Sequence, residues 1–179
     1  LQPVRAFGVD AAIIFSDILP ILEVCGLSQS FVSGKGPVIE QPATPEMIMA
    51  WPETCDPGAT SFTLDAIRLT RRELDNRVPL IGFCGAPFTL ACYAIEGQSS
   101  KEYEKARRMM YAEPKVWHRL MEHIARAAAE YLIAQIEAGA QAVQLFDSWA
   151  GLLGPDDYRE YVLPYSRYVF DRLQVKYPD

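Results

Sequence analysis

Three short apolar segments that lie far apart in the chain constrain its fold more than any other feature. They are residues 11–16 (AAIIFS), 79–84 (PLIGFC) and 142–146 (AVQLF), and Gly, Pro or polar residues bound each of them, as is typical of buried strands. The first two begin 68 residues apart, and the second and third begin 63 residues apart. Connections that long contain helices and join parallel strands, so the sequence predicts an α/β fold with a parallel sheet.

The segments between these strands carry helical patterns. Residues 114–138 repeat apolar side chains every three or four positions, which indicates one buried helix face. Pro114 suits the first turn of this helix, and Gly139 suits its C-terminal end. Further helices are predicted over residues 61–74, after the turn at Gly85-Ala86-Pro87, and over residues 155–173. The Gly- and Pro-punctuated segment 31–42 predicts a hairpin or an extended arm.

Strands that alternate with helices fit either a (β/α)8 barrel or a doubly wound sheet. In both folds, ligands bind at the carboxyl ends of the strands. Polar groups or a Gly-Pro turn follow each of the three strands, at residues 16–17, 84–87 and 147–149. We therefore expect these three segments to meet at one edge of the sheet and to form a site.

Composition limits the partners of the chain. Half of the 179 residues are hydrophobic, which is enough for one domain with a core, although a whole barrel enzyme has roughly 250 residues. The net charge is −6, and no run of Lys and Arg exceeds two residues, so we expect neither nucleic acid nor an anionic membrane surface as a partner. No apolar stretch reaches the roughly 18 residues of a membrane span.

Neither the cysteines nor the histidines form a metal-binding pattern. No two cysteines form a CxxC pair, so we expect buried small hydrophobic residues in a reducing compartment rather than disulfides. His118 and His123 are five residues apart, hence about 140° apart around a helix, and cannot both face one metal ion. The sequence therefore predicts no metal site. The cysteines are Cys25, Cys55, Cys84 and Cys92.

Asp17 is the first candidate site residue. The run AAIIF at residues 11–15 suits a strand buried on both faces, yet Ser16 and Asp17 follow it at once. A carboxylate in an apolar setting costs several kcal/mol unless something compensates its charge. Asp17 is therefore either the N-cap of a following helix or an acceptor for a ligand that carries N–H donors or a developing positive charge.

Tyr93 and Ser148 are further candidates, each with a structural alternative. Tyr93 falls about two turns into the helix after Pro87, where a tyrosine is commonly a core residue with a satisfied hydroxyl. Ser148 follows the third strand, where Asp147 and Ser148 could cap a helix. No histidine base lies near Ser148 in sequence and no GxSxG motif is present, which argues against a serine hydrolase.

Taken together and in order, four segments resemble the uroporphyrinogen decarboxylase family over essentially the whole chain: AAIIFSDIL, GKGP, RVPLIGFCGAPFTLACYAIEG and GAQAVQLFDSWAG. The resemblance implies a (β/α)8 TIM barrel, with residues 1–179 as the middle part of a single barrel domain. It implies a carboxy-lyase that removes the carboxyl groups of the four acetate side chains of uroporphyrinogen III and yields coproporphyrinogen III in haem biosynthesis. It also implies that no metal or organic cofactor takes part.

The resemblance assigns roles to three residues. Loss of CO2 needs an electron sink, and a protonated pyrrole supplies one if the enzyme provides an acid and an anion that stabilises the cation. Asp17 matches the family aspartate that accepts hydrogen bonds from the pyrrole N–H groups and stabilises this charge. Tyr93 would be catalytic with Asp17, hydrogen-bonding it or a substrate carboxylate, and Ser148 would contact a substrate carboxylate.

The resemblance also implies partners and a location, and this sequence departs from the family pattern at two points. It implies a tetrapyrrole as small-molecule partner, a homodimer and a cytoplasmic location, or a plastid location in a plant. The Arg-rich N-terminal segment and the C-terminal histidine of the family have no counterpart in this sequence. We therefore expect that these 179 residues by themselves do not decarboxylate.

Two other functions stay open from the sequence. One is a cobalamin- or corrinoid-dependent methyltransferase of the same barrel superfamily, which would use a zinc site built from His and Cys. No His-x-Cys pair is present. The other is an inactive barrel that serves as a binding module, against which the joint presence of Asp17, Tyr93 and Ser148 argues.

Overall fold

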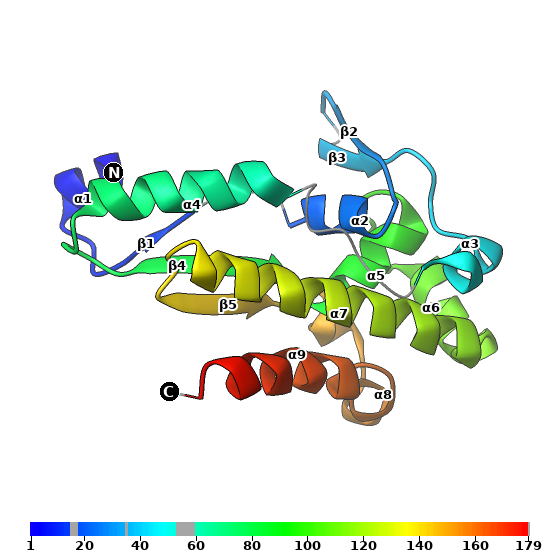
Figure 1. Ribbon diagram of the computed structural model, residues 1–179. Coiled ribbons are helices and arrows are strands. Elements are labelled where there is room, and N and C mark those ends of the chain that lie inside the picture. The colour runs from blue at the N-terminus through cyan, green and yellow to red at the C-terminus, as the bar shows by residue number, and fades with distance from the viewer. Residues whose placement is uncertain (15–17, 35, 53–59, 179) are drawn as a thin grey trace.

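The computed structural model (Figure 1) describes residues 1–14, 18–34, 36–52 and 60–178. Asp17 and Cys55 lie outside the described residues. The elements in chain order are α1 (Gln2–Phe7), β1 (Ala12–Ile13), α2 (Pro20–Val24), β2 (Gln29–Val32), β3 (Gly36–Ile39), α3 (Pro45–Ala50), α4 (Ser61–Leu74), β4 (Leu80–Gly85), α5 (Pro87–Glu96), α6 (Glu104–Ala112), α7 (Pro114–Glu137), β5 (Ala142–Phe146), a short 3₁₀ helix (Ala150–Leu152), α8 (Pro155–Tyr161) and α9 (Leu163–Lys176).

The three predicted strands form one parallel sheet in the order β1-β4-β5. Ile13 is level with Ile81 of β4, and Gly85 is level with Phe146 of β5, so the carboxyl ends of β4 and β5 lie side by side. Helices connect the strands and pack against the sheet, as in part of a (β/α) barrel (Figure 1). The predicted α/β class and the parallel sheet are therefore confirmed.

Sheet burial differs from the prediction at the outer strands. Central β4 is almost entirely buried, but Ile13 of β1 is 46% exposed and Phe146 of β5 is 39% exposed. The prediction that residues 11–15 form a strand buried on both faces is thus wrong at Ile13. Each outer strand pairs with β4 along one edge, so among the described strands only β4 has neighbours on both sides.

The predicted helices are confirmed with small changes at their ends. The helix over residues 61–74 is as expected, and α7 ends at Glu137, one residue before the predicted end. The predicted helix over residues 155–173 is instead two helices, α8 and α9, that meet at Val162. Pro164 explains the break, because proline has no N–H to donate and its ring clashes with the carbonyl four residues earlier.

The segment after α2 forms an antiparallel hairpin apart from the main sheet. In it, β2 pairs with β3, with Gln29 level with Ile39 and Val32 level with Gly36. The hairpin predicted for this part of the chain is confirmed (Figure 1). Its end is tied to α5, because the Ile39 N–H donates to the Gly97 carbonyl at 2.7 Å.

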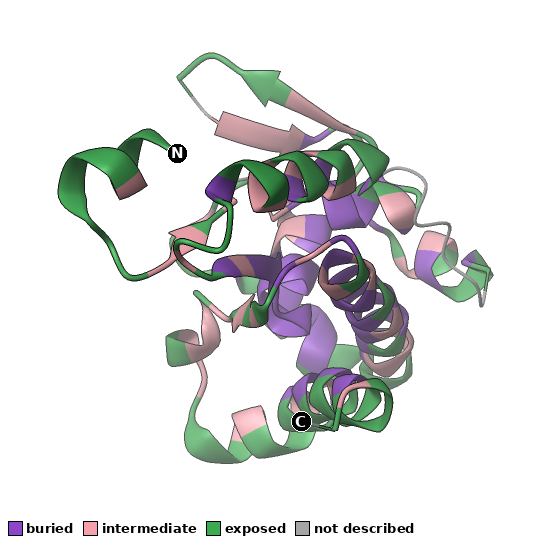
Figure 2. Ribbon diagram, turned by 60° about the vertical axis from the view of Figure 1, so that its left-hand side comes forward, coloured by how far each residue is buried: buried purple, intermediate pink, exposed green. Residues whose placement is uncertain are grey.

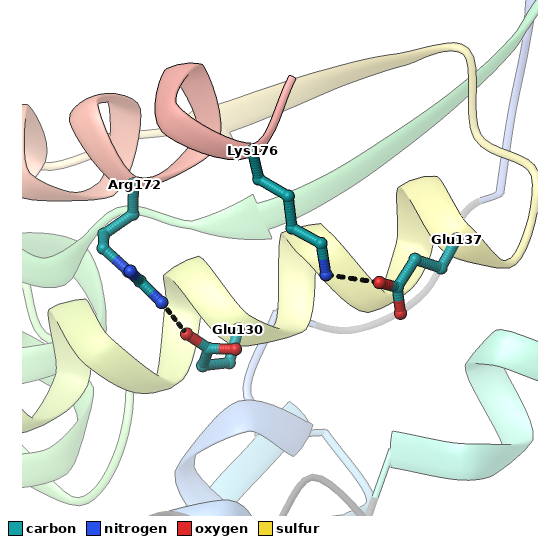
Figure 3. Close-up of polar contacts among 4 residues, drawn as sticks. All are labelled: Glu130, Glu137, Arg172 and Lys176. Carbon is teal, nitrogen blue, oxygen red and sulfur yellow. Dashed lines mark hydrogen bonds and ion pairs between the residues drawn. The ribbon is translucent and has the colours of Figure 1, made fainter. Parts of the chain in front are cut away.

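The core lies around α7, which packs against β4, α5 and α9. Figure 2 shows buried residues concentrated on the elements at the centre of the molecule, and α5 is buried on nearly all sides. Two ion pairs join the exposed sides of α7 and α9: Arg172 with Glu130, at 2.8 Å, and Lys176 with Glu137 (Figure 3). Beneath them, Leu173 of α9 is buried in the core.

The described cysteines and histidines are structural. Cys25, Cys84 and Cys92 are buried, as predicted, and burial raises the pKa of Cys84 to about 12. His123 is buried with its ring centroid 4.9 Å from that of Trp51, whereas His118 Nδ1 lies 2.6 Å from the Tyr165 hydroxyl. Over the described ranges, no three His, Cys, Asp or Glu side chains are grouped to hold a metal ion. Among the helices described, none combines the length and apolar character of a membrane span.

Candidate functional site

The carboxyl ends of β4 and β5 bring two of the three predicted site segments together. The Ala86 N–H, just after β4, donates to the Phe146 carbonyl at the end of β5 at 2.7 Å. Asp147 follows Phe146 directly, so residues 84–87 and 147–149 lie next to each other, as predicted. The third segment, which contains Asp17, lies outside the described residues.

Gly85 allows α5 to begin immediately at this edge. A Cβ at Gly85 would lie 3.0 Å from the Leu90 side chain and 3.3 Å from Ile18, so a larger residue would push these neighbours away. Pro87 then occupies the first turn of α5, where its missing N–H costs nothing. The early start places Thr89 and Tyr93, four residues apart, on one face of α5.

Tyr93 belongs to an aromatic cluster, which we define as Tyr93, Tyr103 and Trp149. The Tyr93 ring centroid lies 5.8 Å from Tyr103 and 6.4 Å from Trp149, both edge to face, and Tyr103 lies 4.8 Å from Trp149. The three residues come from α5, from the residue before α6 and from the loop after β5. Tyr93 is itself only half-buried, so it borders the core without being enclosed by it.

Tyr103 occupies an unusual backbone conformation. Its φ is 47° and its ψ is 50°, in the left-handed region that bulky residues rarely adopt, and this costs about 1–3 kcal/mol. The side chain is fully buried, and in the described part of the chain its hydroxyl makes no well-aligned hydrogen bond. Burial, with a smaller effect from the nearby Tyr93 hydroxyl, raises the pKa of Tyr103. The surrounding packing therefore holds this ring in place against local strain.

Asp147 bonds to the first turn of α5 and does not cap the short helix that follows it. The Thr89 hydroxyl donates to Asp147 Oδ1 at 2.8 Å, and the short helix that follows has no side-chain cap. Asp147 Oδ2 is buried, with no hydrogen-bond partner in the described part of the chain. Burial raises the pKa of this carboxyl, and the hydrogen bond from Thr89 partly offsets the effect. Asp147 therefore does not cap the short helix that follows it, and it bonds to the first turn of α5 instead.

Ser148 lies two residues after the end of β5, and Tyr93 lies on α5, where its ring meets that of Trp149. Ser148 is exposed and sits between Asp147 and Trp149, both of which contact α5. Sequence reasoning missed the residues that link these two candidates. The one available signal was the four-residue spacing of Thr89 and Tyr93, which places both on one helix face. Nothing in the sequence pattern distinguished Tyr103.

Comparison with known proteins identifies the family to which this arrangement belongs. The family model described as uroporphyrinogen decarboxylase matches residues 1–179. The chain belongs to the uroporphyrinogen decarboxylase family. The resemblance of its strand-end motifs to this family is therefore confirmed.

Curated members of the uroporphyrinogen decarboxylase family match along nearly the whole chain. The uroporphyrinogen decarboxylase of Chloroflexus aggregans is 59% identical over 177 residues, covering 98% of this chain and 49% of the relative. That of Carboxydothermus hydrogenoformans is 53% identical over 175 residues, covering 97% of this chain and 50% of the relative. The chain thus spans about half the length of the curated relatives it matches.

A solved structure supports the barrel architecture. A methyltransferase from Methanosarcina mazei superposes with a TM-score of 0.78 over 96% of this chain and 51% of that chain. The sequence identity is 17%, so this likeness concerns the fold alone. Together with the parallel sheet and its helices, it identifies the chain as part of a (β/α) barrel.

Proposed function

We propose that this chain is part of an enzyme that removes the carboxyl groups of the four acetate side chains of uroporphyrinogen III and yields coproporphyrinogen III. The observation that carries the proposal is the family match over residues 1–179, together with 59% identity to the Chloroflexus aggregans decarboxylase. The protonated pyrrole of the substrate serves as electron sink, so the reaction needs an acid and a nearby anion rather than a metal or organic cofactor.

Asp17, Tyr93 and Ser148 are the proposed substrate-binding residues. The Asp17 carboxylate accepts hydrogen bonds from the pyrrole N–H groups and stabilises the developing cation. Two observations support Tyr93 and Ser148: Ser148 follows the carboxyl end of β5, the edge at which barrel enzymes bind their substrates, and the Tyr93 ring contacts the neighbouring Trp149. Their hydroxyl groups can each donate to a carboxylate oxygen. Tyr93 is half-buried and its ring contacts Trp149, the residue after the exposed Ser148, which supports this assignment.

A chimera tests the proposal. This chain replaces the matched region of the Chloroflexus aggregans enzyme, and mass spectrometry follows the number of carboxyl groups on uroporphyrinogen III. We expect the chimera to decarboxylate the substrate, and we expect the 179 residues alone to show no turnover. Asp17→Asn in the chimera should lower kcat on the order of 100- to 1,000-fold, because a stabilising anion is lost from the transition state.

The outcomes separate the alternatives. A chimera that folds like the parent enzyme, by circular dichroism and thermal unfolding, yet leaves the substrate unchanged would contradict the proposed activity. Activity that survives Asp17→Asn nearly intact would remove Asp17 from the mechanism. Corrinoid-dependent methyl transfer is favoured by no specific observation, because the likeness to the Methanosarcina mazei methyltransferase concerns the fold alone.

A homodimer and a cytoplasmic location complete the proposal. The family resemblance supports both, and the relatives described above come from bacteria. Light scattering of the purified chimera tests the dimer, for which we expect twice the mass of one chain. A monomeric mass at micromolar concentration would contradict it.

A further inference from the structure

The Thr89 side chain joins the two elements that carry Tyr93 and Ser148. Its hydroxyl is fully buried and acts both as a donor and as an acceptor of hydrogen bonds. It donates to Asp147 Oδ1 at 2.8 Å, and it accepts from the Trp149 backbone N–H at 3.3 Å. These partners are the residues immediately before and after Ser148, so one hydroxyl on α5 holds both sides of the exposed serine.

A second contact between the same elements lies one helical turn further along α5. Tyr93 follows Thr89 by four residues, and its ring meets the Trp149 ring at 6.4 Å. The loop of residues 147–149 is therefore held against α5 by a polar contact at Thr89 and an aromatic contact at Tyr93. Two contacts one turn apart fix the orientation of a loop as well as its distance, which a single contact does not.

We propose that Thr89 is a positioning residue that fixes Ser148 relative to Tyr93, so that the two hydroxyl groups engage the substrate carboxylates together. The inference rests on the proposed function, since it assigns Thr89 a role in that reaction. Thr89 does not touch the substrate in this scheme. Its effect is transmitted through Asp147 and Trp149, and displacement of a substrate-binding group by about 1 Å can cost on the order of 100-fold in rate.

The chimera described above allows a double-mutant cycle between Thr89 and Ser148. Thr89→Val keeps the shape of the side chain and removes both hydrogen bonds, whereas Thr89→Ser keeps the hydroxyl. We expect Thr89→Val to lower kcat/KM on the order of 10- to 100-fold and Thr89→Ser to restore most of it. In a Ser148→Ala background, the further loss from Thr89→Val should shrink to under about threefold, because the group being positioned is already gone.

The control variant has a Thr→Val substitution outside the proposed site. Thr70→Val changes a partly exposed residue of α4 and should leave kcat/KM unchanged. If Thr89→Val does not fold, Thr89→Cys replaces it, since a thiol of similar size forms weaker hydrogen bonds. The cysteine variant should show a smaller loss with the same dependence on Ser148.

Two results would overturn the inference. One is a loss from Thr89→Val, or from Thr89→Cys, that is equal with and without the Ser148 hydroxyl. The other is a lowered unfolding temperature with kcat/KM unchanged, because a purely structural role for Thr89 predicts that result. A folded but inactive unsubstituted chimera is distinguishable from both, since it contradicts the proposed function before any substitution at Thr89 is made.

Discussion

Replacing Gln135 should destabilise the chain through the backbone of its central strand. Gln135 of α7 is 1% exposed, and its amide faces β4. Its Nε2 donates to the Phe83 carbonyl at 2.8 Å, and its Oε1 accepts from the Phe83 N–H at 2.9 Å. One side chain thus pairs with both polar backbone groups of a residue in the middle of the sheet. Gln135→Met keeps the length of the side chain and removes both hydrogen bonds.

The magnitude follows from what the substitution leaves behind. A buried donor or acceptor that loses its partner costs about 1–3 kcal/mol, so the two groups of Phe83 together cost about 2–6 kcal/mol. The apolar methionine recovers about 1–2 kcal/mol by being buried. We therefore expect the free energy of unfolding to fall by about 1–4 kcal/mol.

Urea unfolding followed by far-UV circular dichroism measures this change. Gln174→Met provides the matched control, because Gln174 is exposed on α9, and its substitution should stay within about 0.5 kcal/mol of the parent. Gly82→Ala should also lower stability by disturbing this contact, because a Cβ at residue 82 would lie 2.5 Å from Gln135 Oε1. A loss from Gln135→Met no larger than that of the control would refute the reasoning.

Three further substitutions test a buried carboxyl, a core side chain and an exposed ion pair. Burial raises the pKa of the Asp147 carboxyl above its ordinary value, because the charged form is disfavoured in the folded chain. The folded chain therefore loses stability as the pH rises from the ordinary pKa through the raised pKa. Asp147→Asn removes the charge and keeps an acceptor for the Thr89 hydroxyl. It should raise the midpoint of urea unfolding at pH 7 and leave it unchanged below about pH 3.8. Equal midpoints of the two proteins at pH 7 would contradict the raised pKa. On α9, Leu173→Ala should cost about 2–4 kcal/mol because it empties part of the core. Arg172→Ala breaks the exposed ion pair with Glu130 and should lower the free energy of unfolding far less. This smaller loss should vanish in about 1 M NaCl, because salt screens exposed charges. A loss of stability that is the same in high salt would contradict an electrostatic origin.

Periodicity and local chemistry were enough to predict most elements of the fold. The helix over residues 61–74 and the strand over residues 142–146 match the expected bounds. These features depend on side chains close in sequence, whose spacing shows which face is buried. The meeting of the β4 and β5 ends was also predictable, because carboxyl ends of parallel strands share one edge. This rule does not extend to Tyr93, which lies about two turns along α5 and meets the loop after β5 through Trp149.

The sequence by itself therefore determined the α/β class, the parallel sheet and the meeting of residues 84–87 with residues 147–149. Only the tertiary structure decided how these segments are held together. The bond from Thr89 to Asp147 spans 58 residues, and the left-handed backbone of Tyr103 opposes its own local preference. Both depend on how closely α5 packs against the loop after β5. That distance is set by the whole core rather than by any short stretch of chain, so no local pattern encodes it.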